Sequence, residues 1–460
     1  MLQHPIINSA DDLSKIGNDA SYPLSGSYIL TKNIEISGDW LSIGNNDFPF
    51  TGIFDGNGNS ITFTTETKIL RSTGPTDNVD GAGLFGNIKS KSNSTCVIKN
   101  LNIVAKGNLS SSSYFGTLVG YSTGGSVENC SVQFFDDFSI NGSSSVGGLL
   151  GYNEEGTVKN CTFIGNVRAD SNYAGGLVGN MKNGSIENSH QDGNVNATLM
   201  AGGLIGQATN VNIRNCSATG NIHSGSNSGG LIGRVFENGT IENSFAICNA
   251  TSSNKAGGLV GGQDVFNMSI RNSYAIGTII ASGYGAGGLI GTIDNGSIET
   301  SYFVGTVLAS NNRMGGLIGS TNSDINILDS FYSDDIESNK YGTAVPDQDM
   351  KQISTYLSGS PYLNSGSHGW NISQDSNSNN IWYIINGEDY PRLSWSYKPP
   401  VIEEPVEVIE DLPQVVEVSD AEVEKNMTPF YLYILFGIVL LIIFSFTFLF
   451  FKKRKSNSNK

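Results

Sequence analysis

The stretch GGLVGNMKNGSIENSHQDGNVNATLMAGGLIGQATNVNIRNCS, from Gly175 to Ser217, decides the fold because it contains one unit twice. Each copy has a glycine-bracketed pentapeptide, GGLVG or GGLIG, and a second apolar element, IENSH or IRNCS, seven residues later. A unit repeated at a period of roughly 20–50 residues is typical of proteins that stack their repeats around one continuous core. The sequence therefore predicts a repeat architecture.

The repeat extends from AGLFG, which ends at Gly86, to GGLIG, which ends at Gly319, with spacings of 27 to 34 residues. Short runs rich in β-branched residues, separated by Gly and Asn, are strand signals, and no helical period competes with them. The strands of one repeat could form a separate hairpin or one coil of a parallel β-helix. The spacing alone leaves both alternatives open.

A file of charges favours the β-helix. The residue after the first Val or Ile of each second element alternates in sign at all eight positions, namely Lys99, Glu128, Lys159, Glu187, Arg214, Glu242, Arg271 and Glu299. If successive repeats stack in register, these side chains lie about 4.8 Å apart, so that like charges would repel and alternating charges attract. We interpret the file as a structural charge ladder along a parallel solenoid.

The two positions after the ladder also form files. The first is mostly Asn, from Asn100 to Asn272, and stacked Asn amides can hydrogen-bond from one repeat to the next. The second holds small residues and indicates an inward or corner position with little room. Cys130 and Cys161 are neighbours in this second file, which makes them a candidate disulfide. Buried free thiols are the alternative.

These residues resemble the GLUG-motif repeat proteins, whose core of glycine, Leu, an apolar residue and glycine is seen here as GLFG, GLVG and GLIG. INSADDLSKIGN near the start is similar to the opening segment of such domains, and IWYIINGEDYPRLSW is similar to the closing one. The resemblance covers roughly residues 6 to 396. It implies a β-solenoid of surface-bound, adhesin-like proteins that share no catalytic residues.

We therefore predict an all-β chain with a right-handed parallel β-helix of about nine rungs, two caps and one C-terminal transmembrane helix. The expected parts are an N-terminal cap with the first rungs (1–80), GLUG-type repeats (81–330), a C-terminal cap (331–397), an acidic Pro/Val/Glu stalk (398–429), the transmembrane helix (430–451) and a basic tail (452–460).

The transmembrane prediction rests on 22 uncharged residues, FYLYILFGIVLLIIFSFTFLFF, which would span roughly 30 Å as a helix. Four cations, Lys452 to Lys455, follow directly, so the positive-inside rule places the tail in the cytoplasm and the solenoid outside. The first fifteen residues hold no apolar core of a signal peptide, so we expect a start upstream of Met1 or another export route. A tail-anchored chain facing the cytosol is the rival topology.

Composition excludes several classes of function. The net charge of −16 argues against nucleic acid as a partner, and neither cofactor nor metal ligation is expected, because no Cys/His cluster has metal spacing. We expect a cell-surface adhesin-like or structural protein that binds carbohydrate or protein weakly and repeatedly, and no catalytic residues. The alternative is a tethered polysaccharide lyase or glycosidase of the β-helix type, which would need two nearby carboxylates free of cationic partners.

Three sequons on predicted turns, at Asn183, Asn238 and Asn295, are candidate glycosylation sites if the chain passes through a glycosylating compartment.

Overall fold

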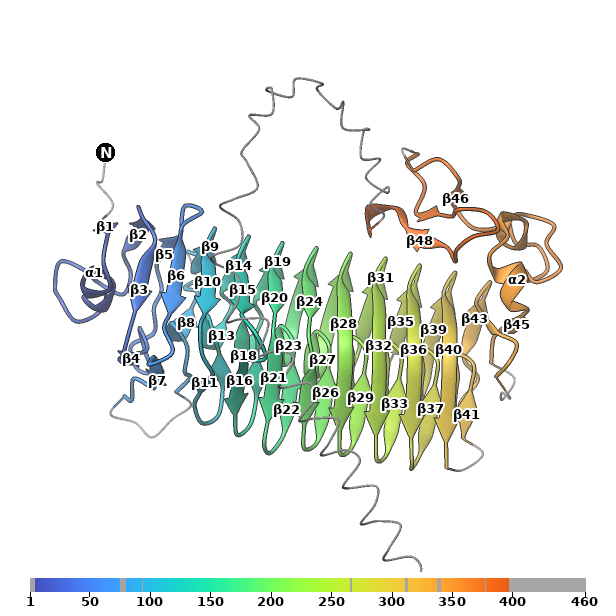
Figure 1. Ribbon diagram of the computed structural model, residues 1–460, viewed down its shortest axis with the longest axis horizontal. Helices are drawn as coiled ribbons and strands as arrows, with labels where there is room; N and C mark the ends of the chain where they lie inside the picture. Colours follow the sequence, from blue (N-terminus) through green and yellow to red (C-terminus); the bar gives the residue numbers. More distant parts are fainter. Residues whose placement is uncertain are drawn as a thin grey trace, which may run out of the picture. The chain divides into compact units, whose positions relative to one another are not determined.

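A computed structural model of the chain describes residues 5–74, 80–92, 94–264, 267–310, 313–336, 341–376 and 378–396. These residues form an all-β parallel solenoid of the right-handed type with about 11 turns (Figure 1). The predicted stalk, transmembrane helix and tail lie outside the described residues. Within the described ranges, no helix is long and apolar enough to cross a membrane.

The largest sheet has 19 strands in two parallel files, because each turn of the chain crosses it twice, before and after a bend. The file that begins inside the pentapeptide contains β8 (Phe85–Lys89), β13 (Val119–Thr123), β18 (Leu150–Glu154), β23 (Val178–Glu187), β27 (Ile205–Arg214), β30 (Ile232–Val235), β34 (Val260–Gln263), β38 (Ile290–Ile293) and β42 (Ile318–Thr321). The file of the second element contains β1 (Ile6–Ile7), β2 (Ser27–Leu30), β5 (Ile53–Asp55), β9 (Val97–Lys99), β14 (Ser126–Glu128), β19 (Thr157–Lys159), the second halves of β23 and β27, β31 (Gly239–Glu242), β35 (Asn267–Arg271), β39 (Asn295–Glu299) and β43 (Asn326–Leu328).

Two further sheets close each turn. The 16-stranded sheet contains β3 (Ile34–Ile36), β6 (Ser60–Phe63), β10 (Asn102–Ala105), β11 (Leu109–Ser110), β15 (Ser131–Phe134), β16 (Ser139–Gly142), β20 (Thr162–Ile164), β21 (Asn166–Ala169), β24 (His190–Asp192), β25 (Val195–Ala197), β28 (Ser217–Ser224), β32 (Phe245–Ser252), β36 (Tyr274–Ala281), β40 (Tyr302–Ala309), β44 (Phe331–Ser333) and β45 (Thr343–Val345). The 8-stranded sheet contains β12 (Phe115–Gly116), β17 (Val146–Gly147), β22 (Tyr173–Gly175), β26 (Met200–Gly202), β29 (Asn227–Gly229), β33 (Lys255–Gly257), β37 (Gly285–Gly287) and β41 (Met314–Gly315).

The interior consists of apolar files that run along the solenoid. The pentapeptide Leu and the Ile or Val that opens the second element point inward along the repeats, as at Leu177 and Ile186, both fully buried. Each such side chain contributes roughly 1.5–3 kcal/mol when it is removed from water. Because one turn cannot cover its own apolar face, the burial requires the neighbouring turns.

Glycine is required where the 8-stranded sheet turns sharply into the 19-stranded sheet. A Cβ atom on Gly175 would lie 2.0 Å from the carbonyl oxygen of Val178, and one on Gly202 would lie 2.0 Å from that of Ile205. No side chain fits at such distances. The first glycine of the pentapeptide therefore marks a sharp corner of the turn.

The solenoid is longer than the predicted nine rungs, because residues before the first pentapeptide also form stacked turns. Strands β2 and β5 pair in parallel, and so do β3 and β6, with buried residues at alternate positions. The prediction was too low because it counted glycine pentapeptides, which the first 80 residues do not contain.

The predicted C-terminal cap (331–397) does more than cover the last turn. After β44 and β45, the chain forms α2 (Asp347–Met350), a 3-10 turn (Ile353–Tyr356), the small strands β46 (Ile372–Ser373), β47 (Trp382–Tyr383) and β48 (Arg392–Leu393), and a final 3-10 turn (Ser394–Ser396). Figure 1 shows this segment folded back along the solenoid above β31 to β43.

The folded-back segment covers a stack of aromatic rings on the outside of the 16-stranded sheet. The rings of Tyr274 and Tyr302, one turn apart, have centroids 5.0 Å from each other and are nearly parallel. Trp382 packs against both rings, and the Tyr302 hydroxyl donates to the carbonyl of Pro391 at 2.6 Å. The last described turn is held by Trp395, whose Nε1 donates to the carbonyl of Asn243 at 2.9 Å.

Candidate functional site

The eight residues of the predicted charge ladder lie in one file on the 19-stranded sheet. Each is the direct register partner of the next, from the pair Lys99 and Glu128 to the pair Arg271 and Glu299. The structure adds a ninth member that the sequence analysis missed, because Asp55 pairs with Lys99 and continues the alternation. Asp55 was not aligned with the ladder because its segment, IFDGNGNS, lacks the second-element pattern.

Four neighbouring pairs in this file are within ion-pair distance. They are Lys99 with Asp55 at 3.4 Å, Lys159 with Glu187 at 3.8 Å, Arg214 with Glu242 at 3.7 Å, and Arg271 with Glu242. All of these side chains are partly exposed, so solvent screening limits each pair to roughly 0.2–1 kcal/mol. The file therefore stabilises the stacking register more than the fold as a whole.

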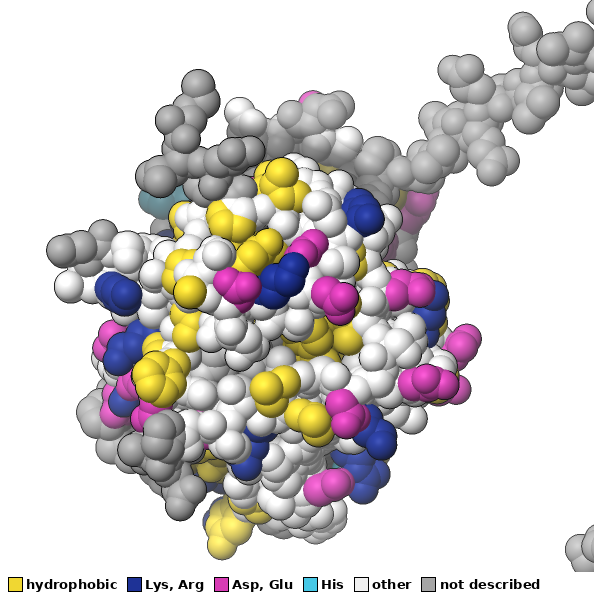
Figure 2. Space-filling model, turned by 90° about the vertical axis from the view of Figure 1, so that its left-hand side faces the viewer, with side chains coloured by type: hydrophobic (Ala, Val, Ile, Leu, Met, Phe, Trp, Pro, Cys, Tyr) yellow, Lys and Arg dark blue, Asp and Glu magenta, His cyan; other side chains and the backbone are white. Residues whose placement is uncertain are grey.

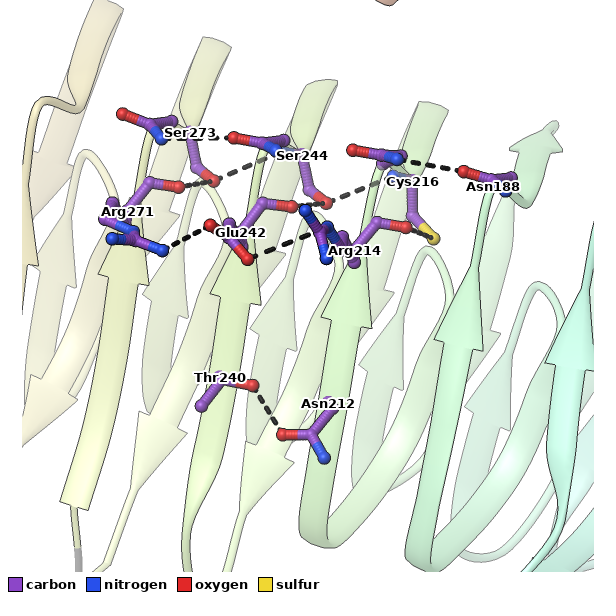
Figure 3. Close-up of polar contacts among 12 residues, drawn as sticks. Asn188, Asn212, Arg214, Cys216, Thr240, Glu242, Ser244, Arg271 and Ser273 are labelled. Carbon is purple, nitrogen blue, oxygen red and sulfur yellow. Dashed lines mark hydrogen bonds and ion pairs between the residues drawn. The ribbon is translucent and has the colours of Figure 1, made fainter. Parts of the chain in front are cut away.

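A second polar file runs beside the ladder, two residues earlier in each strand. Its members are hydroxyl or amide side chains in eight consecutive turns, namely Ser126, Thr157, Ser185, Asn212, Thr240, Ser269, Ser297 and Asn326. Thr240 donates to Asn212 at 2.6 Å, and Ser126 and Thr157 lie 2.9 Å apart. We call the surface formed by this file and the charge ladder the ladder face (Figure 3).

The ladder face is hollowed where the two files run together. A groove of about 410 Å³ spans the turns from β23 to β39 and is lined by Asn212 and Thr240 on one side and by Arg214, Glu242 and Arg271 on the other. Only the charged wall of this groove was predicted from the sequence. The hydroxyl or amide residue that stands two positions before the ladder residue, from Ser126 onward, was a readable signal for the other wall of the groove.

The Asn file forms the corner next to the ladder face. Asn100, Asn129 and Asn160 have φ angles of 52° to 53°, a left-handed conformation that Asn tolerates better than most residues. The Asn129 amide donates to Asn100 at 3.1 Å, and the Asn160 amide donates to Asn129 at 2.9 Å. The file therefore combines the turn conformation with hydrogen bonds between turns.

The candidate disulfide is not formed, since Cys130 and Cys161 are both free and buried. Each thiol donates instead to the carbonyl oxygen two residues before it, Cys130 to Glu128 at 3.3 Å and Cys161 to Lys159 at 3.2 Å. Burial raises the pKa of the Cys130 thiol, which keeps it protonated and unreactive. The alternative of buried free thiols therefore describes this pair.

The same inward file has Ser in most later turns, and the Ser hydroxyl accepts a hydrogen bond from a backbone N–H as well as donating one. Ser244 donates from its hydroxyl to the Glu242 carbonyl at 2.8 Å and accepts from the Cys216 backbone N–H at 3.1 Å. Ser273 repeats the pattern with the Arg271 carbonyl and the Ser244 N–H. The hydroxyl thus connects adjacent turns inside the corner (Figure 3).

The three candidate glycosylation residues are exposed, but only Asn238 lies outside a strand. Asn183 falls inside β23, where its φ of 51° is that of a bend, and Asn295 is the first residue of β39, so the strands extend to these two positions. The strands continue there because stacked turns share a bend, where the Asn238 amide donates to Asn210 at 3.0 Å and the Asn210 amide donates to Asn183 at 3.1 Å. The Asn238 nitrogen, to which a glycan would be attached, therefore already has a partner.

A polysaccharide-processing enzyme would need two nearby carboxylates without cationic partners, whereas several carboxylates of the 19-stranded sheet are engaged by cations or hydrogen bonds. Glu154 accepts from Lys182 at 2.8 Å, Glu242 lies between two arginines, and Glu128 accepts from Ser126 at 2.6 Å. Among the described residues, no group of three or more His, Cys, Asp or Glu side chains could hold a metal ion. The arrangement offers many hydrogen-bond donors and acceptors at a constant spacing, which suits binding.

Comparisons with known proteins agree with the repeat. Residues 142–168 and 197–222 match the sequence model described as the GLUG motif, so the chain carries GLUG-motif repeats. No curated protein matches the chain. A crystal structure from Bacteroides ovatus named "putative immunoglobulin A1 protease" is 20% identical, with a TM-score of 0.36, and the match covers 86% of this chain and 93% of that one. A likeness at that TM-score carries no argument about function.

Proposed function

We propose that this GLUG-repeat solenoid is a non-catalytic, surface-displayed binding protein whose ladder face holds an extended carbohydrate chain. The observation that carries the proposal is the pair of polar files in register over seven turns, from Ser126 and Glu128 to Ser297 and Glu299, with a groove between them. A ligand with its own short repeat can make the same weak contact at turn after turn, so that affinity accumulates along its length.

Charge favours a neutral polymer as the ligand. The nine-membered ladder has five acids and four bases, which leaves a net charge of −1 over its whole length. Such a file produces no strong field to select a polyanion or a polycation. While the Thr240 hydroxyl donates to Asn212, its oxygen can still accept from a sugar hydroxyl, and the Asn212 amide nitrogen can donate to one.

Membrane anchoring is part of the same proposal and rests on the sequence. The uncharged segment 430–451, followed by Lys452 to Lys455, would hold the solenoid outside the cell on the stalk of residues 398–429. Protease treatment of intact cells tests this topology. Digestion of the solenoid without permeabilisation supports it, whereas protection until the cells are opened supports the cytosol-facing alternative.

A glycan array probed with residues 1–397 tests the binding function. This fragment contains the solenoid, the folded-back C-terminal segment and the aromatic cluster that the two share. Binding that strengthens with the length of a neutral oligosaccharide is expected, without release of shorter products. Release of shorter oligosaccharides would contradict the proposal and favour the polysaccharide-processing alternative.

A matched pair of variants assigns the binding to the ladder face. Thr240→Ala removes one hydroxyl from the groove and should weaken binding, whereas Thr251→Ala removes a hydroxyl from the 16-stranded sheet and should not. Equal effects of the two substitutions would show that the glycan lies elsewhere.

A further inference from the structure

The first turn of the solenoid is incomplete at the N-terminal end. It contributes β1 and the short helix α1 (Ala10–Ser14), whereas the next turn contributes a strand, β4 (Asp39–Leu41), that pairs only with β7 (Lys68–Leu70) among the described strands. In Figure 1, β4 lies at the N-terminal end of the solenoid next to β7. One edge of β4 therefore has no neighbouring strand in the described part of the chain.

The hydrogen bonds between β4 and β7 show which backbone groups face that open edge. Lys68 N–H donates to the Gly38 carbonyl at 3.0 Å, and Ser42 N–H donates to the Leu70 carbonyl at 2.9 Å. In a parallel ladder only alternate residues of a strand face a given neighbour. The N–H and C=O groups of Asp39 and Leu41 consequently point away from β7.

A cavity of about 570 Å³ lies along this edge. Its walls are β4 and the turn up to Phe48 on one side and residues 14–18 with Leu24 on the other. Small-molecule and short-peptide sites have volumes of roughly 300–1,000 Å³, so a few residues of extended chain would fit. The cavity occupies the place that a strand of the incomplete turn would take.

Large apolar side chains are exposed at the cavity. Leu41 is 53% exposed and Phe48 is 59% exposed, and both line it. Leu70, the register partner of Leu41, is 43% exposed beside them. Figure 2 looks onto this end of the molecule, where hydrophobic side chains reach the surface among charged ones. Grouped apolar exposure next to an unpaired strand edge is typical of a site that another chain covers.

We propose that the open edge of β4 is a docking site for an extended peptide segment of a partner protein, which adds to the solenoid as one more parallel strand. The segment has the form basic, apolar, apolar. The strand on the other side of β4 indicates this form, because β7 places Lys68 beside Asp39, Ile69 beside Trp40 and Leu70 beside Leu41. A strand on the open side meets the same three side chains, so a cation next to Asp39 and a Leu next to Leu41 are again favoured.

The open edge of β4 lies apart from the groove of the ladder face, so strand docking does not depend on carbohydrate binding. Its probe is a fluorescent peptide with the sequence of residues 66–72, ETKILRS, added to the full-length chain in detergent and followed by anisotropy. Saturable binding is expected. A peptide with Glu in place of its Lys should bind about fivefold more weakly, the effect of an unfavourable charge pair across neighbouring strands.

Two variants of the chain localise the binding. Leu41→Pro removes the N–H that faces the cavity while leaving the bonds of β4 to β7 intact, and it should weaken binding about tenfold or more. Leu41→Val keeps that N–H and is its control. Asp39→Lys leaves the backbone unchanged and should reverse the preference, so that the Glu-containing peptide binds more tightly.

Absence of peptide binding to the wild-type chain would overturn the proposal. So would equal affinity of the Leu41→Pro variant and the wild type, because the strand would then dock elsewhere. If Leu41→Pro perturbs folding, as judged by circular dichroism, the charge reversal at Asp39 decides the matter, and an unchanged preference there refutes the site.

Discussion

Glu242→Lys provides the sharpest test of the charge ladder. Glu242 is 27% exposed and lies between Arg214 and Arg271, which are 60% and 53% exposed. The substitution removes two attractions and creates two repulsions between neighbouring turns. Each exposed pair is worth roughly 0.2–1 kcal/mol after solvent screening, so the four changes together should destabilise this part of the solenoid by about 1–3 kcal/mol. Glu242→Gln removes only the attractions and should cost about half as much.

Hydrogen exchange of the amides in β27, β31 and β35 is the appropriate measurement, because a stacked repeat protein can open locally without unfolding as a whole. Exchange should accelerate in the order wild type, Glu242→Gln, Glu242→Lys, and the differences should shrink in 1 M salt as the charges are screened. Glu66→Lys, an exposed site outside the ladder, should leave these amides unchanged. Equal effects of the two Glu242 variants, or effects that persist in high salt, would refute the electrostatic reasoning.

Four further outcomes are expected. Cys216→Ser should leave the urea midpoint unchanged or raise it, because the hydroxyl can make both hydrogen bonds seen in the later Ser positions, each worth about 1 kcal/mol. In the wild type, burial raises the pKa of the Cys216 thiol to about 12, so the native protein should not react with thiol reagents at this residue. Asn160→Ala should cost roughly 1–2 kcal/mol more than Asn160→Gly in urea unfolding, since φ is 53° there. Trp395→Ala should speed proteolysis of residues 382–396 without affecting the repeats, because this ring and its Nε1 hold the last described turn. Burial opposes ionisation of Asp55, but hydrogen bonds from the Asn100 side chain and the Asn57 backbone, together with the Lys99 charge, lower the pKa of its carboxyl overall. The ionised carboxylate should therefore stabilise the fold fully above the unfolded pKa of about 4, and this contribution should be lost as the pH falls through the lower folded pKa. The difference in urea midpoint between wild type and Asp55→Asn should close in that pH range.

Much of the ladder face could be predicted because in-register stacking produces a repeating pattern in the sequence. Charges that lie next to each other in space recur one repeat apart, so the alternation from Lys99 to Glu299 was visible as a pattern. The same reasoning could have found the hydroxyl file from Ser126 to Asn326, which has the same period. Asp55 could not be found in this way, because its turn has a different length and lacks the motif that aligns the others.

The amino-acid sequence by itself determined the strands, their parallel register and the inward files, because each depends on contacts between equivalent positions of neighbouring repeats. The tertiary structure alone decided the path of the C-terminal segment over Tyr274 and Tyr302, the open edge of β4, and the groove of the ladder face. Those features bring together segments that do not repeat with a common period. Their packing depends on shapes and distances in three dimensions, which leave no repeating pattern in the sequence.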